Sequence, residues 1–184
     1  MPLPGSTIFL TAKRDSTQMK PDRKFLLSHP AHFVAFGFGA GLAPKAPGTF
    51  GTLLALPIYL ASHALGGVYV VTVLVVVLFG LGVWASAKAG KSLGVADHGG
   101  IVIDEIAAFV LVMAFVPSGA HFWLWTLVAF AAFRVFDIVK PWPIGLADRK
   151  IKGGFGVMFD DLLAALLTIV FVLTLRALTI NPAT

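Results

Sequence analysis

The sequence predicts an all-α fold, a compact multi-pass helical membrane domain with about four to five apolar helices, some of them short or broken. Of the 184 residues, 58% are hydrophobic and only 12% are charged, whereas a soluble domain carries about a quarter charged residues. The mean hydropathy is +0.89. In addition, apolar segments of helical length follow one another, separated by short stretches that hold glycine, proline or charge.

The chain is expected to divide into a polar, poorly ordered N-terminal leader, residues 1–28, and a membrane domain, residues 29–184. The apolar stretch 8–12 in the leader is too short for a secretory signal, so the helices themselves are expected to direct insertion. Five apolar segments follow: 53–64, 68–87, 106–116, 122–136 and 162–178. Only the second and fifth have the roughly 17–25 residues of a full crossing. The others are predicted to be partial or tilted helices, and Pro57 interrupts the first.

The turns between segments predict the topology. Residues 62–67 and 117–119 are short and rich in helix breakers, so each is expected to join a helical hairpin. The loops 40–52, 88–105 and 137–161 then emerge on one face. Of the fourteen Lys and Arg residues, all except Arg176 belong to the leader, to these loops or to the adjoining helix edges. All nine Asp and Glu residues lie on the same side. The distribution of positive charge predicts that this face is cytoplasmic.

Composition also excludes some classes of protein. The chain has no cysteine, which excludes disulfides, thiolate metal sites and a cysteine nucleophile. The net charge of +5 suits contact with anionic lipids or an anionic substrate. Nucleic acid is not expected as a partner, because the cations are spread over several membrane-flanking segments without an aromatic stripe.

Two acidic pairs, Asp104-Glu105 and Asp160-Asp161, stand beside apolar runs. One interpretation is helix-end chemistry, with Asp160 capping the helix that follows it. For Asp160-Asp161 it accounts for one aspartate well and for the second only partly. The other interpretation is a divalent cation, which would remove the repulsion between converging carboxylates. Because the ligands are all oxygens, Mg²⁺ is the predicted metal, held by Asp104, Glu105, Asp160 and Asp161, with Asp137 as a further acid of the catalytic set.

Basic and hydroxyl residues lie near these acids in the sequence. The stretch GLAPKAPGTFGT (41–52) precedes a helix, which is typical of a phosphate cradle, although close packing through small residues is the alternative. Arg134, Asp137 and Lys140 recur every third residue, so they form either an ion-pair ladder or a site with surplus positive charge. The residues predicted to bind a substrate phosphate are Lys45, Thr49, Arg134, Lys140, Arg149 and Lys152.

Four motifs carry a resemblance to a known family: 41–52, DHGGIVIDE (97–105), FRVFDIVKPWPI (133–144) and GGFGVMFDD (153–161). From about residue 29 to its last helix, the chain resembles phosphatidylglycerophosphatase A, a family of bacterial inner-membrane enzymes. The resemblance implies Mg²⁺-dependent hydrolysis of phosphatidylglycerophosphate to phosphatidylglycerol and phosphate, in phospholipid biosynthesis. It also places Asp104, Glu105, Asp137, Asp160 and Asp161 at the acidic motif positions of the family. Gly145 and Ala108 depart from the family pattern, which often has a basic residue and a glycine there.

Several alternatives stay open at this point. Activated water, with Arg134 and Lys140 stabilising the transition state, and an aspartyl-phosphate intermediate on Asp160 or Asp161 are both compatible with these residues. Asp97 and His98 form either a proton relay or a structural contact, and His29 and His32 are expected to pack. The alternative function is a small transporter or channel whose acids bind a cation, although such acids are expected nearer the middle of the membrane. Head-group and acyl-chain selectivity and oligomeric state are not predicted.

Overall fold

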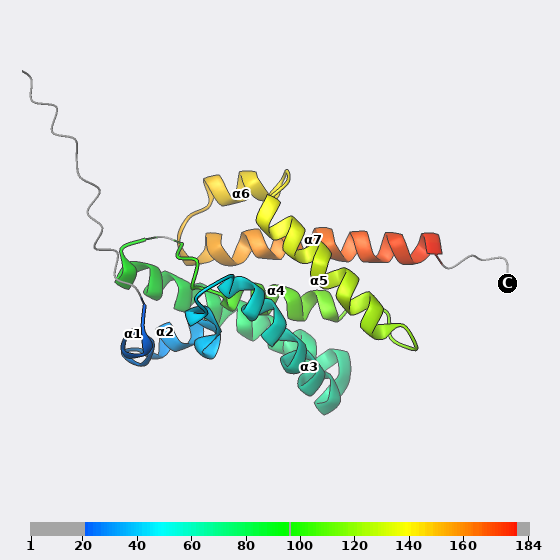
Figure 1. Ribbon diagram of the computed structural model, residues 1–184, viewed down its shortest axis with the longest axis horizontal. Helices are drawn as coiled ribbons and strands as arrows, with labels where there is room; N and C mark the ends of the chain where they lie inside the picture. The colour runs from blue at the N-terminus through cyan, green and yellow to red at the C-terminus, as the bar shows by residue number, and fades with distance from the viewer. Residues whose placement is uncertain (1–20, 96, 180–184) are drawn as a thin grey trace, which may run out of the picture.

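The computed structural model describes residues 21–95 and 97–179, and all regular structure within them is helical. This confirms the predicted all-α class. The elements (Figure 1) are α1 (Arg23–Leu27), α2 (Pro30–Ala35), the 3-10 helix η1 (Gly37–Leu42), α3 (Pro47–Leu93), α4 (Ile103–Met113), α5 (Phe122–Val139), α6 (Ile144–Lys150) and α7 (Gly153–Thr179). Among the described helices, α3, α5 and α7 are long and apolar enough to cross a membrane.

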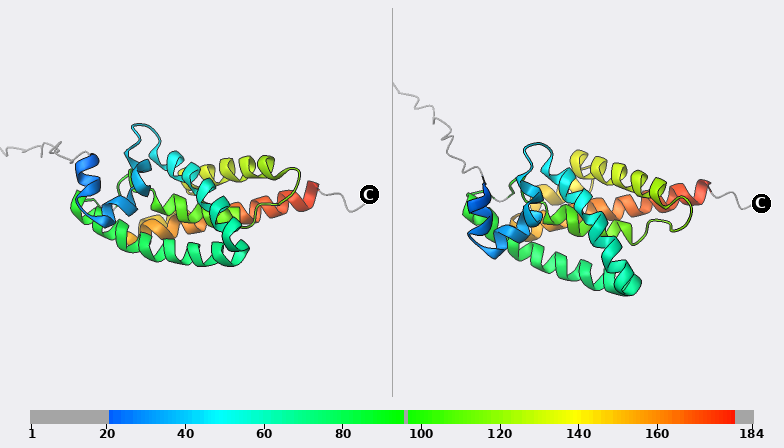
Figure 2. Two further views of the ribbon diagram at one scale, coloured as in Figure 1. Left: turned by 90° about the horizontal axis from the view of Figure 1, so that it is seen from below. Right: turned by 60° about the horizontal axis from the view of Figure 1, so that its bottom comes forward.

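The long element α3 is a helical hairpin. Its backbone leaves the helical region at Gly66 and Gly67, and Gly67 has a φ of +61°, which glycine adopts without strain. The second half then runs back at an angle to the first (Figure 2). The turn predicted at 62–67 is therefore present. Pro57, which was expected to interrupt the first segment, lies inside the helix.

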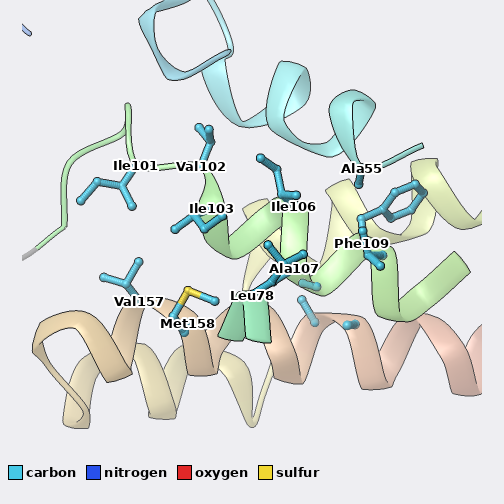
Figure 3. Close-up of a cluster of buried hydrophobic side chains, with 14 of the residues drawn as sticks. Ala55, Leu78, Ile101, Val102, Ile103, Ile106, Ala107, Phe109, Val157 and Met158 are labelled. Atoms are coloured by element: carbon cyan, nitrogen blue, oxygen red, sulfur yellow. The ribbon is translucent and has the colours of Figure 1, made fainter. Parts of the chain in front are cut away.

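The short helix α4 is the centre of the core. Only 11 residues long, it is too short to cross a bilayer, which takes about 20 residues, and it is apolar on nearly every side, as expected of a buried helix. Figure 3 shows it between the first half of α3 and α7, with Ile106 and Phe109 turned toward α3 and Ala107 above Met158 of α7. The larger helices thus enclose the segment that carries one of the acidic pairs.

The N-terminal elements pack against the end of α3. The ring of His32 stacks on Phe25 with centroids 4.1 Å apart, and its Nε2 lies 3.0 Å from the Ser92 hydroxyl. The Nδ1 of His29 accepts a hydrogen bond from the backbone of Ala31 and caps α2. Both histidines therefore have the packing roles expected of them. Residues 1–20 of the predicted leader lie outside the described residues, whereas Phe25 at its end is buried.

One boundary prediction was wrong, because α7 begins at Gly153 and not near residue 162. Glycine is a poor helix former, but a Cβ at Gly154 would collide with the carbonyl oxygen of Val83 in α3, so this glycine lets the two helices pack closely. Asp160 and Asp161 consequently lie within the helix. The interpretation of Asp160 as an N-cap is thereby excluded.

Candidate active site

Three carboxylates from two helices converge at one end of the molecule. Asp104 and Glu105 lie in the first turn of α4, and Asp161 approaches them from α7. One carboxylate oxygen of each residue lies within 4.8 Å of the other two. Asp104 is 8% exposed and Asp161 is 4% exposed. We call these three residues the carboxylate cluster.

The cluster has the donor set of a hard-cation site. Glu105 Oε2 and Asp161 Oδ2 are buried, and neither has a hydrogen-bond partner among the described residues. Buried polar atoms are nearly always hydrogen-bonded, and a buried charge without a partner is strongly unfavourable. Carboxylate oxygens that converge without donors are the ligands that Mg²⁺ uses. The residues therefore fit the predicted metal, with Asp104, Glu105 and Asp161 as its candidate holders.

Arg134 of α5 lies beside the cluster. Its Nη1 donates a hydrogen bond to Asp137 Oδ2 at 2.6 Å and lies 3.7 Å from Glu105 Oε1. The same nitrogen is 3.5 Å from the Thr52 hydroxyl in α3. The charge of Asp137 also interacts with Glu105 and Asp161. Arg134 and Asp137 thus form the ion pair predicted from their spacing, at the edge of the carboxylate cluster.

Two glycines of the 41–52 motif let α3 approach this region closely. A Cβ at Gly48 would collide with Glu105 Oε1 and would lie 3.1 Å from Arg134 Nη2. A Cβ at Gly51 would lie 2.8 Å from the Cβ of Val102. These contacts bear out the close-packing interpretation of the motif at both positions. The motif also holds Lys45, which is exposed, and Thr49, which is half-buried, and their phosphate-binding role stays a prediction.

Gly48→Ala is expected to lower activity at least about tenfold and to reduce stability by about 1–3 kcal/mol, because the added methyl displaces Glu105 and Arg134. Gly80→Ala is the matched control, since a Cβ at this position of the same helix meets nothing within 4 Å and alanine favours the helix. Turnover and thermal unfolding of both variants measure the difference. Equal turnover and equal thermal stability of the two variants would show that Gly48 is not needed for the close approach of α3 to Glu105 and Arg134.

Lys140 separates Asp160 from the carboxylate cluster. It is the left-handed C-cap of α5, with a φ of +46°, so it leaves the helical stripe expected with Arg134 and Asp137. Its Nζ donates hydrogen bonds to Asp148 Oδ1 at 2.8 Å and to Asp160 Oδ2. Asp160, predicted as a fourth metal ligand, is paired in this way and is not part of the cluster. Its Oδ1 is buried without a partner among the described residues.

The electrostatics of the ion pair between Lys140 and Asp148 favour its charged form. Burial lowers the pKa of Lys140, but the hydrogen bonds to Asp148 and Asp160 outweigh burial, and the pKa is raised above its ordinary value. The hydrogen bond from Lys140 in turn lowers the pKa of Asp148. Both groups are therefore charged at neutral pH. A phosphate that binds Lys140 has to share this lysine with two carboxylates.

A cavity of about 230 Å³ lies beside these residues, lined by Asp97, Asp148, Lys152 and the start of α7. Lys152 Nζ donates to the carbonyl oxygen of Asp148 at 2.6 Å. His98 Nδ1 accepts a hydrogen bond from the backbone of Gly100, and the proton relay with Asp97 stays a prediction. Asp148, which lines this cavity, and the contact of Thr52 with Arg134 were not singled out from the sequence. Arg149 is exposed.

Apolar helices that enclose buried carboxylates beside an arginine and a lysine define a helical membrane protein with an acidic centre suited to a phosphate substrate. A family model described as phosphatidylglycerophosphatase A matches residues 33–176. The chain therefore belongs to the phosphatidylglycerophosphatase A family, and it is a phosphatase. This confirms the resemblance and removes the transporter or channel alternative.

Individual relatives are similar in sequence to most of the chain. A Haemophilus influenzae phosphatidylglycerophosphatase A is 41% identical over 160 residues, covering 87% of this chain and 97% of that protein. The Escherichia coli phosphatidylglycerophosphatase A is 38% identical over 143 residues, covering 77% and 81%. A Bacteroides thetaiotaomicron protein, provisionally named a phosphatidylinositol-3-phosphatase, is 37% identical over 150 residues, covering 78% and 91%. No solved structure matches the chain.

Proposed function

We propose that this protein hydrolyses phosphatidylglycerophosphate to phosphatidylglycerol and phosphate, with Mg²⁺ held by Asp104, Glu105 and Asp161. The observation that carries the metal proposal is the carboxylate cluster with its unpartnered oxygens, Glu105 Oε2 and Asp161 Oδ2. The names of the Haemophilus and Escherichia relatives support the substrate. When bound, Mg²⁺ would polarise the phosphate and lower the pKa of a bound water.

The residues around the cluster have roles that their contacts support. Arg134 would bind a phosphate oxygen and stabilise the charge that develops on it. In support, its guanidinium pairs with Asp137 and lies next to Glu105. Thr52 holds the same nitrogen from α3. Lys140 orients Asp160 through their hydrogen-bonded ion pair. Lys45, Thr49, Arg149 and Lys152 remain candidates for contacts with the head group as it enters from the same end.

Two chemical routes are proposed for the transfer. In the first, water attacks phosphorus, the bond from phosphorus to the glycerol oxygen breaks, and that oxygen leaves with a proton as the alcohol of phosphatidylglycerol. In the second, a carboxylate of Asp160 or Asp161 attacks phosphorus, and the bond to the glycerol oxygen breaks so that this oxygen leaves with a proton as the alcohol. Water then hydrolyses the aspartyl phosphate, which frees the carboxylate and phosphate. A phosphoenzyme trapped by rapid quench from radiolabelled substrate would establish the second route. Its absence during active turnover would favour the first.

We further propose that the chain crosses the bacterial inner membrane several times with the carboxylate cluster toward the cytoplasm. The turn of α3 at Gly66 and Gly67 lies at the opposite end from α6 and the start of α7 (Figures 1 and 2). Because nearly all Lys and Arg residues belong to the end with the acids, the positive-inside rule supports this orientation.

Purified full-length protein in mixed micelles should release phosphate from phosphatidylglycerophosphate, and EDTA should lower the rate at least about 100-fold, because the metal supplies several kcal/mol of transition-state stabilisation. Excess Mg²⁺ should restore the rate. Full activity in EDTA would reject the metal proposal. Phosphatidylinositol-3-phosphate and phosphatidic acid serve as competing substrates, and faster release from either would reject the head-group proposal while leaving the metal proposal intact.

A further inference from the structure

A second cavity, of about 510 Å³, lies between the start of α5 and the end of α7. It is at the opposite end of the molecule from the carboxylate cluster, where the 114–121 turn meets the last turn of α7 (Figure 1). Its walls are mostly apolar, with Leu124 and Trp125 from α5 and Leu175 from α7. Ser118, His121 and Arg176 add polar groups to its lining. A volume of this size is typical of small-molecule sites.

The charge in this cavity is that of Arg176. Among the described residues, Arg176 is the only Lys or Arg at this end, and every Asp and Glu belongs to the other end. None of the ion pairs among the described residues includes Arg176. A cation beside apolar walls at a membrane surface is neutralised most readily by the phosphate of a lipid, which guanidinium binds through two parallel hydrogen bonds.

The surroundings place this cavity at the depth of lipid head groups. Trp123 is 65% exposed and Trp125 lines the cavity, and tryptophan side chains collect at the boundary between acyl chains and head groups. The apolar walls below Arg176 can cover the first methylenes of an acyl chain. Ser118 and His121 can donate to phosphate or glycerol oxygens.

From these observations we propose that this cavity binds one anionic glycerophospholipid of the leaflet opposite the carboxylate cluster, with its phosphate on Arg176. The described residues of the lining include no carboxylate, so the ammonium group of a zwitterionic lipid would have no partner there, whereas the phosphate of an anionic lipid pairs with the arginine and brings no further cation. The proposal does not depend on which lipid the carboxylate cluster hydrolyses.

Native mass spectrometry of the full-length protein, titrated with phosphatidylglycerol or phosphatidylethanolamine in detergent, tests the proposal. Arg176→Gln is expected to weaken the binding of one phosphatidylglycerol about tenfold, while Lys88→Gln, which removes an exposed cation from the opposite end of the molecule, should bind as the wild type does. Val128→Trp, which keeps Arg176 and fills the cavity, should also lose this lipid. Phosphate release should stay within about twofold of wild type in all three variants.

Two results would overturn the proposal. The first is equal binding of phosphatidylglycerol by Arg176→Gln and Lys88→Gln, which would mean that Arg176 only extends toward water from the helix end. The second is equally tight binding of phosphatidylethanolamine by the wild type. Neither result bears on the proposed phosphatase reaction, because lipid binding is measured without turnover.

Discussion

Asp161→Asn is expected to lower phosphate release about a thousandfold, a loss of about 4 kcal/mol of transition-state stabilisation. The substitution keeps the volume and the helix but removes one charge of the carboxylate cluster, whose ligand atoms lie within 4.8 Å of one another. In the metal-free protein the same substitution should raise the unfolding temperature, because it removes one of three like charges that are buried together. The measurements are turnover with saturating Mg²⁺ and thermal unfolding in EDTA.

Opposite effects on activity and on metal-free stability are what a metal site predicts and a purely structural role does not. Asp104→Asn should behave in the same way, since Asp104 is a second member of the cluster. Asp148→Asn is the control, because Asp148 is a carboxylate of the same end that pairs with Lys140 outside the cluster. A loss of stability in EDTA for Asp161→Asn would contradict the assignment of this residue to a metal site.

Lys140→Gln is expected to lower the free energy of unfolding by about 2 kcal/mol. Lys140 is the ion-pair partner of Asp160, whose side chain is 6% exposed, so its removal leaves a buried carboxylate without a cation. Breaking a fully buried pair costs about 3–5 kcal/mol, and a smaller loss is expected here because the Lys140 side chain is 27% exposed. Chemical or thermal unfolding in detergent measures this loss of stability.

The double variant Lys140→Gln, Asp160→Asn should regain most of this stability, since neither charge is then left alone. Lys152→Gln is the matched control, because Lys152 donates only to a backbone carbonyl oxygen and should lose less than about 0.5 kcal/mol. If the double variant is no more stable than Lys140→Gln, the lysine does not act through Asp160. A raised KM with unchanged stability would instead favour direct phosphate binding by Lys140.

Much of the fold follows from local features of the sequence. Apolar segments too long and too uncharged for a soluble domain predict helices in a membrane, because only helices satisfy their own backbone there. The Gly66-Gly67 pair predicts the turn of α3. The acidic pairs predict a common site, since isolated carboxylates are unfavourable beside apolar residues. These inferences need only composition, spacing and local chemistry. The structure contains the turn, and it brings together three of the four paired acids, without Asp160.

What the sequence by itself determined, then, is a helical membrane protein with acids and cations gathered at one end. The tertiary structure alone decided which acids meet. Asp160 and Asp161 are neighbours, but consecutive helical residues point about 100° apart, so the rotation of α7 about its axis selects Asp161 for the cluster and turns Asp160 toward Lys140. Close packing against α3 fixes that rotation, through Gly154 against Val83 and Met158 against Gly82. Such contacts join residues far apart in the chain, and no local pattern in the sequence encodes them.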